Sequence, residues 1–505
     1  MALASTLTTA LDGVTARPVT VEANIGPGLP GMYVVGLGDA AVRESRDRIR
    51  TAVANSTLEW PKTKIVVSLS PADLPKAGSH FDLPIALSVL AARDPFAARR
   101  LADALVLGEL GLDGSVRPVS GVLPALLAAR DRGNAVRTVV IPAGNAAEAA
   151  LLAGHDVLLA QSLAEVWCWA VGEGELPRAG RSGTAAQRPP AADFADIAGQ
   201  PGARRAAEIA AAGGHHLLMI GPPGSGKSMI AERLPSILPP LTQTQSIEAT
   251  AVHSVAGMVD AAVRHAPFVA PHHSVTRAAL LGGGAGHPRP GAVSLAHHGI
   301  LFLDEASEIP ARVLDGLRTP LEHGRVRIIR ARREVTFPAR FQLILAANPC
   351  LCGAEKPTSC TCTSAQRAGY LANLSGPLRD RLDMTVHLGL AGAVVNAEGE
   401  EPSATIAARV GAARERAQHR WGRHHLRALV NGDVAGAHLR RHAPADEAGM
   451  ALISAYLADG AISQRGVDKT LRLAWTICDL DAAGRPDIDH VARALELRAG
   501  AEVTA

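Results

Sequence analysis

The chain carries GPPGSGKS at residues 221–228, and this short stretch decides its fold. It matches the phosphate-loop pattern G-x-x-x-x-G-K-[ST]. The preceding HHLLMI (215–220) is typical of a buried strand, and the following SMIAERL (228–234) is typical of the start of a helix. Strand, glycine-rich turn and helix form the context that this motif requires, so the chain is expected to bind a nucleoside triphosphate.

Each position of this loop has an expected task. Backbone N–H groups of residues 222–227 would surround the β-phosphate, and Gly224 and Gly226 permit the backbone angles and close approach that this needs. Lys227 would reach the β- and γ-phosphates, and the Ser228 hydroxyl would ligate Mg²⁺. The expected cofactors are therefore ATP and Mg²⁺. The cofactor-binding residues are Gly221, Pro222, Pro223, Gly224, Ser225, Gly226, Lys227 and Ser228.

A second element of the same chemistry is GILFLDEA, residues 299–306. Four apolar residues followed by Asp-Glu indicate a buried parallel strand that ends in two acids at the carboxyl edge of a sheet. We expect Asp304 to hold Mg²⁺ through water and Glu305 to polarise the attacking water. A strand that merely ends in an acidic turn is the alternative, and the phosphate loop in the same domain disfavours it.

The composition excludes several classes of protein. Hydrophobic residues make up 47% of the 505 residues and aromatic residues 3%, so the cores must be built from Ala, Val, Leu and Ile. No apolar run approaches the roughly 20 residues that span a bilayer. The first residues, MALASTLTTALDGV, lack the basic region of a signal peptide, and six cysteines do not suggest a disulfide framework. We expect a cytoplasmic protein without a membrane partner.

The chain divides into three regions and a linker. Residues 1–172 alternate short β-type runs with helical stretches, which is typical of an α/β domain. Residues 173–192 are polar and rich in Gly and Pro, as in a linker. A second α/β pattern covers 193–390. The last region, 391–505, begins in a stretch typical of a loop (389–404), and residues 405–502 show helical periodicity in at least four segments.

Several stretches resemble one family of AAA+ ATPases. PRPGAVSLAHHGILFLDEA, HAPFVAPHHS and LGGGAGHPRPG are similar to the magnesium-chelatase type of AAA+ module, and with NPCLCG they resemble the YifB/ComM family. The resemblance extends over essentially the whole chain, from GLPGMYVVGLGDAAVRESRDRIR to LRLAWTICDL. It implies an AAA+ core with a parallel sheet over 193–390, a helical lid over 391–505, and a homo-oligomeric ring, expected to be a hexamer. In that family, ComM is regarded as a DNA helicase that drives branch migration during natural transformation.

The same resemblance assigns three further catalytic residues. FQLILAANP (341–349) resembles the sensor-1 strand, which places Asn348 near the γ-phosphate and the lytic water. SGPLRDRLDM (375–384) resembles the segment with the arginine finger, which acts on a neighbour's nucleotide; the register favours Arg381, with Arg379 as the alternative. SQRGVDKTLRLAWT (463–476) resembles the sensor-2 helix, in which Arg465 fits the arginine and Lys469 replaces an arginine usual in the family. A surface salt bridge is the alternative role for each arginine.

The amino-terminal region resembles the Lon protease domain, through PADLPKAGSHFDLPIALSVLAA and LGELGLDGSVRPVSGVLPALLAA. Such a domain uses a serine nucleophile activated by a lysine. The position that matches the catalytic lysine is Leu123, and Ser79 near the nucleophile segment would have no such base. We therefore expect residues 1–172 to be proteolytically inactive and to serve interaction or DNA guidance.

RVRIIRARREVTFPA (325–339) places five arginines within nine residues, between two short β-type runs. The pattern predicts a hairpin with a basic tip just before the sensor-1 strand. In the superclass that the family belongs to, such a hairpin projects into the channel of the ring, where arginines can follow a phosphate backbone without reading sequence. The candidate DNA-binding residues are Arg327, Arg330, Arg332 and Arg333. A solvated hairpin with charges that only serve solubility is the alternative.

Cysteines and histidines give two further candidate groups. Four cysteines form C-x-C-x₇-C-x-C at Cys350, Cys352, Cys360 and Cys362, which fits a structural Zn²⁺ site, and equally reduced thiols or a redox-sensitive pair. The paired histidines of PHHS (271–274) and AHHG (296–299) are expected to point to opposite sides of extended segments, which makes each pair a poor chelate.

The sequence favours an ATP-driven ring motor that acts on single-stranded or branched DNA. ATP hydrolysis follows from the residues, whereas DNA translocation follows from the resemblance. The alternative is a chelatase-type AAA+ subunit that remodels a protein partner, and chelatase motor subunits lack the Lon-like leading domain. An ATP-dependent protease is a third possibility, which would need a Ser–Lys dyad that the sequence does not offer.

Overall fold

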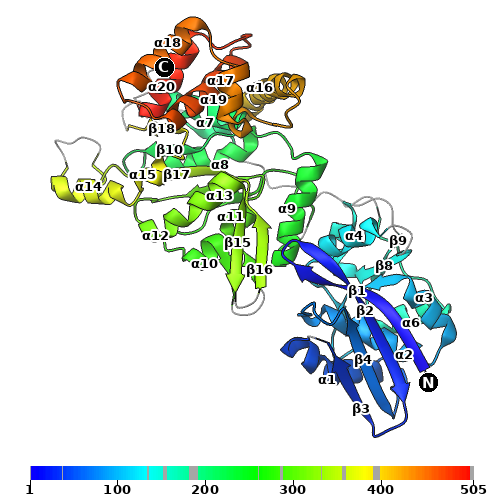
Figure 1. The fold of residues 1–505 in the computed structure, drawn as a ribbon. Coiled ribbons are helices and arrows are strands. Elements are labelled where there is room, and N and C mark those ends of the chain that lie inside the picture. Colours follow the sequence, from blue (N-terminus) through cyan, green and yellow to red (C-terminus); the bar gives the residue numbers. More distant parts are fainter. Residues whose placement is uncertain are drawn as a thin grey trace.

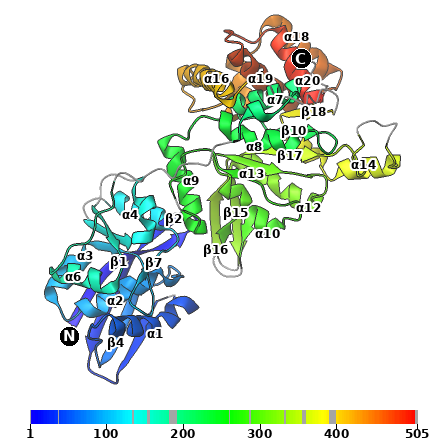
Figure 2. The ribbon, with the colours of Figure 1, turned by 180° about the vertical axis from the view of Figure 1, so that it is seen from behind.

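The computed structural model describes most of the chain and shows three regions in succession (Figure 1). The N-terminal and C-terminal regions lie at opposite ends of an elongated molecule, with the phosphate-loop region between them (Figures 1 and 2). The described residues are 2–36, 38–132, 136–151, 156–180, 192–259, 261–284, 288–330, 333–354, 360–389 and 399–500.

A seven-stranded sheet forms the first region, in the order β3-β4-β2-β1-β5-β8-β9. Strands β1 and β2 form a long antiparallel hairpin, and β5, β8 and β9 continue the sheet in parallel. The strands are β1 (Ala2–Asp12), β2 (Thr15–Gly26), β3 (Gly31–Val35), β4 (Lys64–Ser70), β5 (Ala104–Val106), β8 (Thr138–Pro142) and β9 (Asp156–Ala160), with a small pair β6 (Glu109–Leu110) and β7 (Val116–Arg117). The helices are α1 (Ala40–Asn55), α2 (Asp82–Ala91), α3 (Pro95–Ala102), α4 (Val122–Asp131), α5 (Ala146–Ala149) and α6 (Leu163–Val171).

The first region continues past its predicted boundary. Residues 176–179 belong to the predicted linker, yet Leu159 N–H donates to the Pro177 carbonyl and Ala179 N–H donates to the Val157 carbonyl. Leu176 is buried in the core of the N-terminal region. The packing of this region therefore extends into the first part of the predicted linker; residues 181–191 lie outside the described residues.

A five-stranded parallel sheet forms the second region, in the order β11-β14-β17-β10-β18. Its central strands are buried along their whole length, as expected of a parallel sheet with helices on both faces. The strands are β11 (Phe268–Val269), β14 (Ile300–Leu303), β17 (Gln342–Ala347), β10 (Leu217–Ile220) and β18 (Met384–His387), with a small pair β12 (Gly282–Gly283) and β13 (Arg289–Pro290). The helices are α7 (Pro201–Gly213), α8 (Lys227–Ile237), α9 (Gln243–Ala256), α10 (Arg277–Leu281), α11 (Ala292–Leu295), α12 (Ala311–Leu314), α13 (Arg318–His323), α14 (Ser364–Ala372) and α15 (Gly376–Arg379).

The predicted basic hairpin is present as β15 (Arg325–Arg330) and β16 (Arg333–Pro338), paired from Arg325↔Pro338 to Arg330↔Arg333. Alternation along the strands buries Val326, Ile328, Val335 and Phe337 in the core that the hairpin shares with β14 and β17. One face of the hairpin is thus anchored to the sheet.

The third region is helical, as predicted. It consists of α16 (Ser403–Arg423), α17 (Gly436–His442), α18 (Glu447–Ala458), α19 (Gln464–Leu480) and α20 (Ile488–Ala499). Trp421 and Trp475 meet edge to face with ring centroids 6.0 Å apart, and the Arg420 guanidinium lies 3.8 Å from the Trp475 ring centroid. A single apolar core joins these helices to α7, β10 and β18. The fold class, α/β with a helical C-terminal region, is confirmed.

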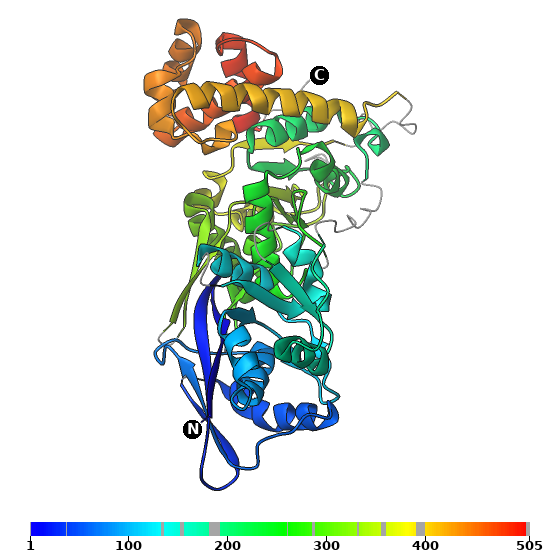
Figure 3. The same ribbon diagram turned by 90° about the vertical axis from the view of Figure 1, so that its right-hand side faces the viewer.

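Among the described residues, the N-terminal region touches the second region at two places, and Figure 3 shows the two stacked along the long axis. At the first, Ser254 of α9 donates its hydroxyl to the buried carboxylate of Glu148, and Gly121 N–H donates to the Ser254 carbonyl. At the second, Gly13 in the β1–β2 turn lies against β16, where an added Cβ would come within 2.7 Å of the Thr336 carbonyl oxygen. The described part of the chain holds no helix with both the length and the apolar character that crossing a bilayer requires.

Candidate active site

The phosphate loop lies between the carboxyl end of β10 and the start of α8. Gly224 and Gly226 take φ of +80° and +89°, which side chains other than glycine rarely adopt. A Cβ at either glycine would meet no described atom within 4 Å, so the space above the loop is open. Gly226 precedes the first turn of α8, whose N–H groups point into that space, an arrangement that favours a phosphate.

Lys227 lies within the loop and is almost fully buried. Its ammonium donates to the carbonyl oxygens of Gly221 at 2.7 Å and Pro222 at 2.8 Å, and to Asn348 Oδ1 at 3.2 Å. Burial lowers the pKa of Lys227, and the nearby charge of Asp304 opposes that shift. A fourth acceptor is Ser225 Oγ at 3.4 Å, and all four are neutral, which leaves the ammonium suited to an anionic phosphate.

The predicted Mg²⁺ ligands are in contact. Ser228 Oγ donates to Asp304 Oδ2 at 2.7 Å, and Asp304 Oδ1 accepts from Glu305 N–H at 2.8 Å. A hydroxyl and a carboxylate beside a phosphate site are the oxygen donors that Mg²⁺ takes in such proteins. The residues therefore fit the ion, and the structure brings five predicted residues together at one edge of the sheet: Lys227, Ser228, Asp304, Glu305 and Asn348.

Glu305 has a partner that the sequence analysis did not identify. Its Oε2 lies 2.6 Å from Nδ1 of His273, and both side chains are partly exposed. His273 follows β11, which runs parallel to β14, so both residues leave the sheet at the same edge. The PHHS segment could have indicated this pair, because His273 comes four residues after one strand and Glu305 two residues after the other.

Arg381 and Arg465 lie away from this site. They lie at the edge of the sheet where the parallel strands begin, whereas the phosphate loop lies at the edge where the strands end. Strand β18 runs parallel to β10, and Arg381 precedes β18, whereas the phosphate loop follows β10. Four-residue strands separate the two edges by roughly 13 Å. Arg381 forms an ion pair with Glu322 of α13, and Arg465 lies 3.3 Å from Asp380 and 3.7 Å from Glu322. The alternative finger residue, Arg379, is exposed at the end of α15.

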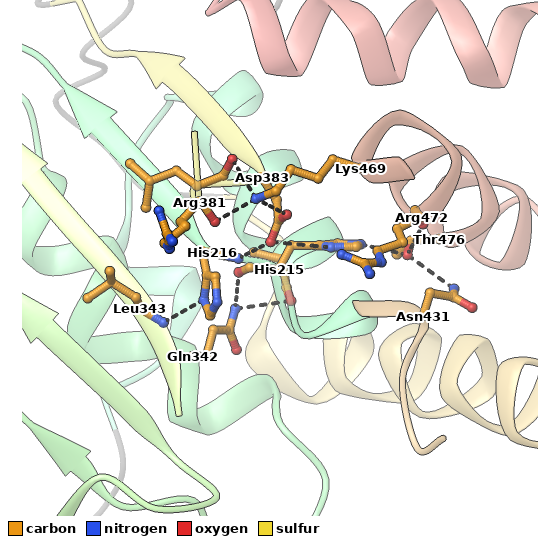
Figure 4. A network of polar contacts seen from close by, with 12 residues as sticks. His215, His216, Gln342, Leu343, Arg381, Asp383, Asn431, Lys469, Arg472 and Thr476 are labelled. Atoms are coloured by element: carbon orange, nitrogen blue, oxygen red, sulfur yellow. Dashed lines mark hydrogen bonds and ion pairs between the residues drawn. The ribbon is translucent and has the colours of Figure 1, made fainter. Parts of the chain in front are cut away.

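A buried polar network connects α19 to the Arg381 segment (Figure 4). The Lys469 ammonium lies 2.9 Å from Asp383 Oδ1 and donates to the carbonyl oxygens of Arg381 at 2.6 Å and Leu382 at 3.1 Å. Burial alone would raise the pKa of Asp383, but the Lys469 ammonium, together with the His216 N–H, holds the pKa of this carboxyl well below its usual range. Lys469, noted above only as a departure from the family pattern, thus fixes the backbone that presents Arg381.

Two histidines complete this network. His216 N–H donates to Asp383 Oδ2 at 2.9 Å, and His216 Nδ1 accepts from Leu343 N–H at 3.0 Å. His215 Nε2 lies 2.7 Å from Thr476 Oγ1 of α19. Burial lowers the pKa of both histidines to about 4, so both are neutral at pH 7.

The expectation that adjacent histidines diverge is wrong for both pairs. The ring centroids lie 4.0 Å apart in His272 and His273 and 3.9 Å apart in His297 and His298. The first pair lies in a turn, in which Val275 N–H donates to the His272 carbonyl. In the second pair, the φ of +59° at His298 turns the segment away from an extended path, and both Nε2 atoms approach Glu248 Oε2, at 3.4 and 2.6 Å. The hydrogen-bonding role is supported instead of a metal site: His297 Nδ1 accepts from Arg340 N–H, which leaves the proton of the neutral ring on Nε2.

The four predicted cysteines converge. Their Sγ atoms lie within 4.8 Å of one another, with 3.3 Å between Cys350 and Cys352 and 3.5 Å from each of these to Cys360. Four thiolates on one Zn²⁺ lie about 3.8 Å apart. A backbone N–H of Ala354 lowers the pKa of Cys352 to about 5, and the Arg367 side chain lowers that of Cys360, whereas burial raises the pKa of Cys350 to about 11. The cluster, which also includes Cys362, fits a zinc ion.

The predicted DNA contacts are described in part. Arg327 is exposed on β15 and forms an ion pair with Glu334 of β16, so its charge is compensated within the hairpin. Arg330 and Arg333 occupy the ends of the two strands; the structure does not describe their side chains, and Arg332 lies outside the described residues.

The N-terminal region shows no Ser–Lys pair in the described contacts of Ser79. The Ser79 hydroxyl donates to Glu109, and the nearby Lys76 is fully buried and donates to the Pro71 carbonyl. Leu123 is buried at the start of α4. A cavity of about 480 Å³ beside Ser79 is lined on its other side by Val255, Gly257 and Arg289 of the second region.

Comparison with known proteins places these sites in one family. Residues 193–393 match the family described as magnesium chelatase, subunit ChlI; residues 21–145 match subunit ChlI of Mg-chelatase, and residues 400–498 match the C-terminal part of magnesium chelatase subunit ChlI. The chain is 49% identical to the uncharacterized protein Rv2897c of Mycobacterium tuberculosis over 99% of both chains.

Two further relatives carry the family's names. The chain is 38% identical to YifB of Escherichia coli, over 99% of this chain and 97% of that protein. It is also 38% identical to competence protein ComM of Haemophilus influenzae, over 99% of this chain and 98% of that protein. With matches along its whole length, the chain belongs to the YifB/ComM family of magnesium-chelatase-like proteins.

Proposed function

We propose that this protein is an ATP-hydrolysing ring motor that moves along single-stranded or branched DNA and promotes branch migration. The observation that carries the proposal is the separation of its catalytic groups. Lys227, Asp304 and Asn348 lie at one edge of the sheet, and Arg381 lies at the other. This separation supports a site that a second copy of the chain completes. In a ring, every interface between neighbouring subunits would hold one such site. The name of the relative ComM, a competence protein, supports a role in DNA uptake or recombination.

Hydrolysis at such an interface uses this chain's own residues in turn. The loop amides and Lys227 bind the β- and γ-phosphates, and the Ser228 hydroxyl and Asp304 carboxylate hold Mg²⁺, which offsets phosphate charge when bound. Glu305 accepts the proton of the attacking water, and Asn348 positions that water. Arg381 of the adjoining copy stabilises the charge that develops in the transition state, with Arg465 beside it.

The hairpin β15–β16 is the proposed DNA contact. Its buried face is fixed to the core of the second region, so motion of β14 and β17 during hydrolysis would reach it. Arg330, Arg332 and Arg333 supply the charge, because Glu334 compensates Arg327. Contacts of arginine to phosphates bind any sequence and weaken with salt. Such a motor belongs in the cytoplasm, where DNA and ATP meet.

We also propose that Cys350, Cys352, Cys360 and Cys362 bind one structural Zn²⁺. The first of these follows Asn348 by two residues, so the ion would staple the loop that leaves the sensor-1 strand. Purified protein should contain about one zinc per chain by metal analysis. Replacement of Cys352 and Cys360 by serine should remove it; metal-free wild-type protein would contradict the proposal.

ATP turnover with single-stranded, duplex and four-way-junction DNA, measured side by side, tests the motor. Junction or single-stranded DNA should raise turnover several-fold, and Arg330→Ala/Arg332→Ala/Arg333→Ala should weaken DNA binding and flatten its salt dependence. Glu305→Gln is the control that retains ATP binding without turnover. Stimulation by a protein partner and by none of the DNAs would favour the chelatase-type alternative.

A further inference from the structure

Three histidines come together in the helical C-terminal region, away from the sites described above. His424 caps the carboxyl end of α16, and His438 and His442 lie one turn apart on α17. The ring centroid of His438 is 5.1 Å from that of His424 and 4.8 Å from that of His442, and the centroids of His424 and His442 are 6.4 Å apart. Two helices therefore bring three imidazole rings to one place.

The positions of the rings suit a shared metal ion. Histidines four residues apart lie on the same face of a helix, where both can bind one ion. Each ligating nitrogen lies about 2.0 Å from the ion, so the centroids of rings that share it are about 5 Å apart. The distances from His438 to its two neighbours match this value. The distance between His424 and His442 exceeds it, so one ring must turn toward the ion, and the exposed His442 is free to do so.

His438 carries a nitrogen atom that the protein leaves without a partner. Its Nε2 is buried, and no described residue forms a hydrogen bond with it. Buried polar atoms in folded proteins nearly always have a partner, which can be a bound water or an ion. The unpaired Nε2 is therefore a second observation, independent of the ring distances, that points to a ligand at this cluster.

The charge state of His438 also suits a metal. Burial lowers the pKa of this ring, and His442 and His424 lower it further, because neighbouring imidazoles disfavour each other's positive charge. A neutral imidazole has a free lone pair on one nitrogen and is the form that ligates metals.

Packing against Trp421 is the alternative role for the cluster. The Trp421 ring centroid lies 6.2 Å from that of His438 and 6.0 Å from that of His424. This contact accounts for the positions of these two rings. It accounts neither for His442, which is exposed at the end of α17, nor for the buried Nε2 of His438.

We propose that His424, His438 and His442 bind one divalent transition-metal ion through their ring nitrogens, with water as a fourth ligand. Imidazole suits Zn²⁺ and Ni²⁺, whereas Mg²⁺ and Ca²⁺ prefer oxygen ligands. The ion would fix the end of α16 to α17. Because Arg440 of α17 forms an ion pair with Asp468 of α19, the ion would also steady α19.

Zinc binding by the full-length protein is the test. On dialysis against increasing Zn²⁺ followed by metal analysis, the wild type should bind one zinc per chain that His442→Ala binds at least about 10-fold more weakly, because a ligand is lost. His438→Phe, which keeps a ring beside Trp421 but has no ring nitrogen, should lose the same zinc. Zn²⁺ should also raise the unfolding temperature of the wild type more than that of either variant, since the ion binds the folded chain.

The matched control is His419→Ala, which removes an exposed histidine of α16 and should bind zinc as the wild type does. The same comparison in the Cys352→Ser/Cys360→Ser background separates this site from the proposed cysteine site. Equal zinc binding by the wild type and His442→Ala overturns the proposal. Because His442 is exposed, this variant decides the question even if His438→Phe fails to fold.

Discussion

Two buried lysines lie at opposite edges of the same five-stranded sheet, and their surroundings differ in one respect. Lys227 donates to two backbone carbonyls and the amide oxygen of Asn348. Lys469 also donates to two carbonyls, and in addition pairs with the buried carboxylate of Asp383 at 2.9 Å. Burial lowers the pKa of both lysines.

The presence of a carboxylate partner at Lys469, and of only neutral acceptors at Lys227, indicates the role of each ammonium group. A buried ammonium that is paired with a carboxylate is compensated in place and holds structure together. One that meets only neutral acceptors keeps its attraction for an anion that arrives later. Lysine is scarce in this chain, with six residues against forty-five arginines. One of these lysines is placed to attract an anion, and the other holds two parts of the structure together.

Lys227→Ala should give the largest effect. It removes the cation from the phosphate loop, so ATP affinity should fall at least about 100-fold and turnover should fall below detection. Binding of a fluorescent ATP analogue and phosphate release are the measurements. Lys469→Met, studied at a temperature at which it stays folded, is the control and should still bind the analogue. If Lys227→Ala still binds the analogue and the folded Lys469→Met does not, the assignment of the phosphate-binding role to Lys227 and the structural role to Lys469 is wrong.

Arg381→Ala should lower turnover by about 10³-fold and leave ATP binding intact, because an arginine finger stabilises only the transition state. In the proposed ring a neighbouring copy provides this arginine, because Arg381 lies at the edge of the sheet opposite Lys227. Mixing Arg381→Ala with the inactive Lys227→Ala protein should therefore restore part of the turnover. At some interfaces the intact loop of one variant faces the intact arginine of the other. A mixture without activity would count against action between copies.

The sequence was sufficient to predict the site residues that lie close together in the chain or at the ends of parallel strands. The phosphate loop is a contiguous motif, and the predicted Asp304 and Asn348 meet Ser228 and Lys227 because three parallel strands end at one edge. The helical C-terminal region was predictable from periodicity alone. The convergence of the four cysteines was also predictable, because a short loop connects them.

The sequence could not give contacts that depend on backbone angles or on partners far away in the chain. The left-handed backbone of His298 brings two neighbouring rings to one side, and no pattern of residue types specifies it. Lys469 meets Asp383 across 86 positions, and only the packing of α19 on β18 shows that it supports Arg381. The His273–Glu305 pair depends on two strands that leave the sheet together.

Lys469→Met should lower the free energy of unfolding by about 3–5 kcal/mol, because it leaves the Asp383 carboxylate buried without its cation. Chemical denaturation followed by circular dichroism measures this. The double variant Lys469→Met/Asp383→Asn should recover a substantial part, since asparagine keeps an acceptor for His216 N–H. A single variant as stable as the wild type would show that this edge does not depend on the ion pair.

The smallest expected effect is on the pH dependence of stability, and it tests the same edge through His216. Its pKa is lowered by burial from 6.5 to about 4, against the attraction of Asp383 and with the repulsion of Lys469 and Arg472. Between pH 6.5 and 4 the unfolded chain therefore binds a proton at this position that the folded chain does not, and stability falls as pH falls. At about 1.4 kcal/mol per pH unit, this one group accounts for up to about 3 kcal/mol across that window.

His216→Asn should remove that contribution. The asparagine side-chain oxygen can accept from Leu343 N–H as His216 Nδ1 does, but it does not titrate in this range. Unfolding of wild type and variant at pH 7 and pH 4.5 should therefore show a shallower loss for the variant, with His215 accounting for part of what remains because its pKa is also about 4. Equal slopes would mean that His216 is protonated in the folded chain. A charged imidazole would then lie beside Lys469. The Asp383 carboxylate would face two cations, and the Lys469–Asp383 ion pair would no longer balance the charge at this edge.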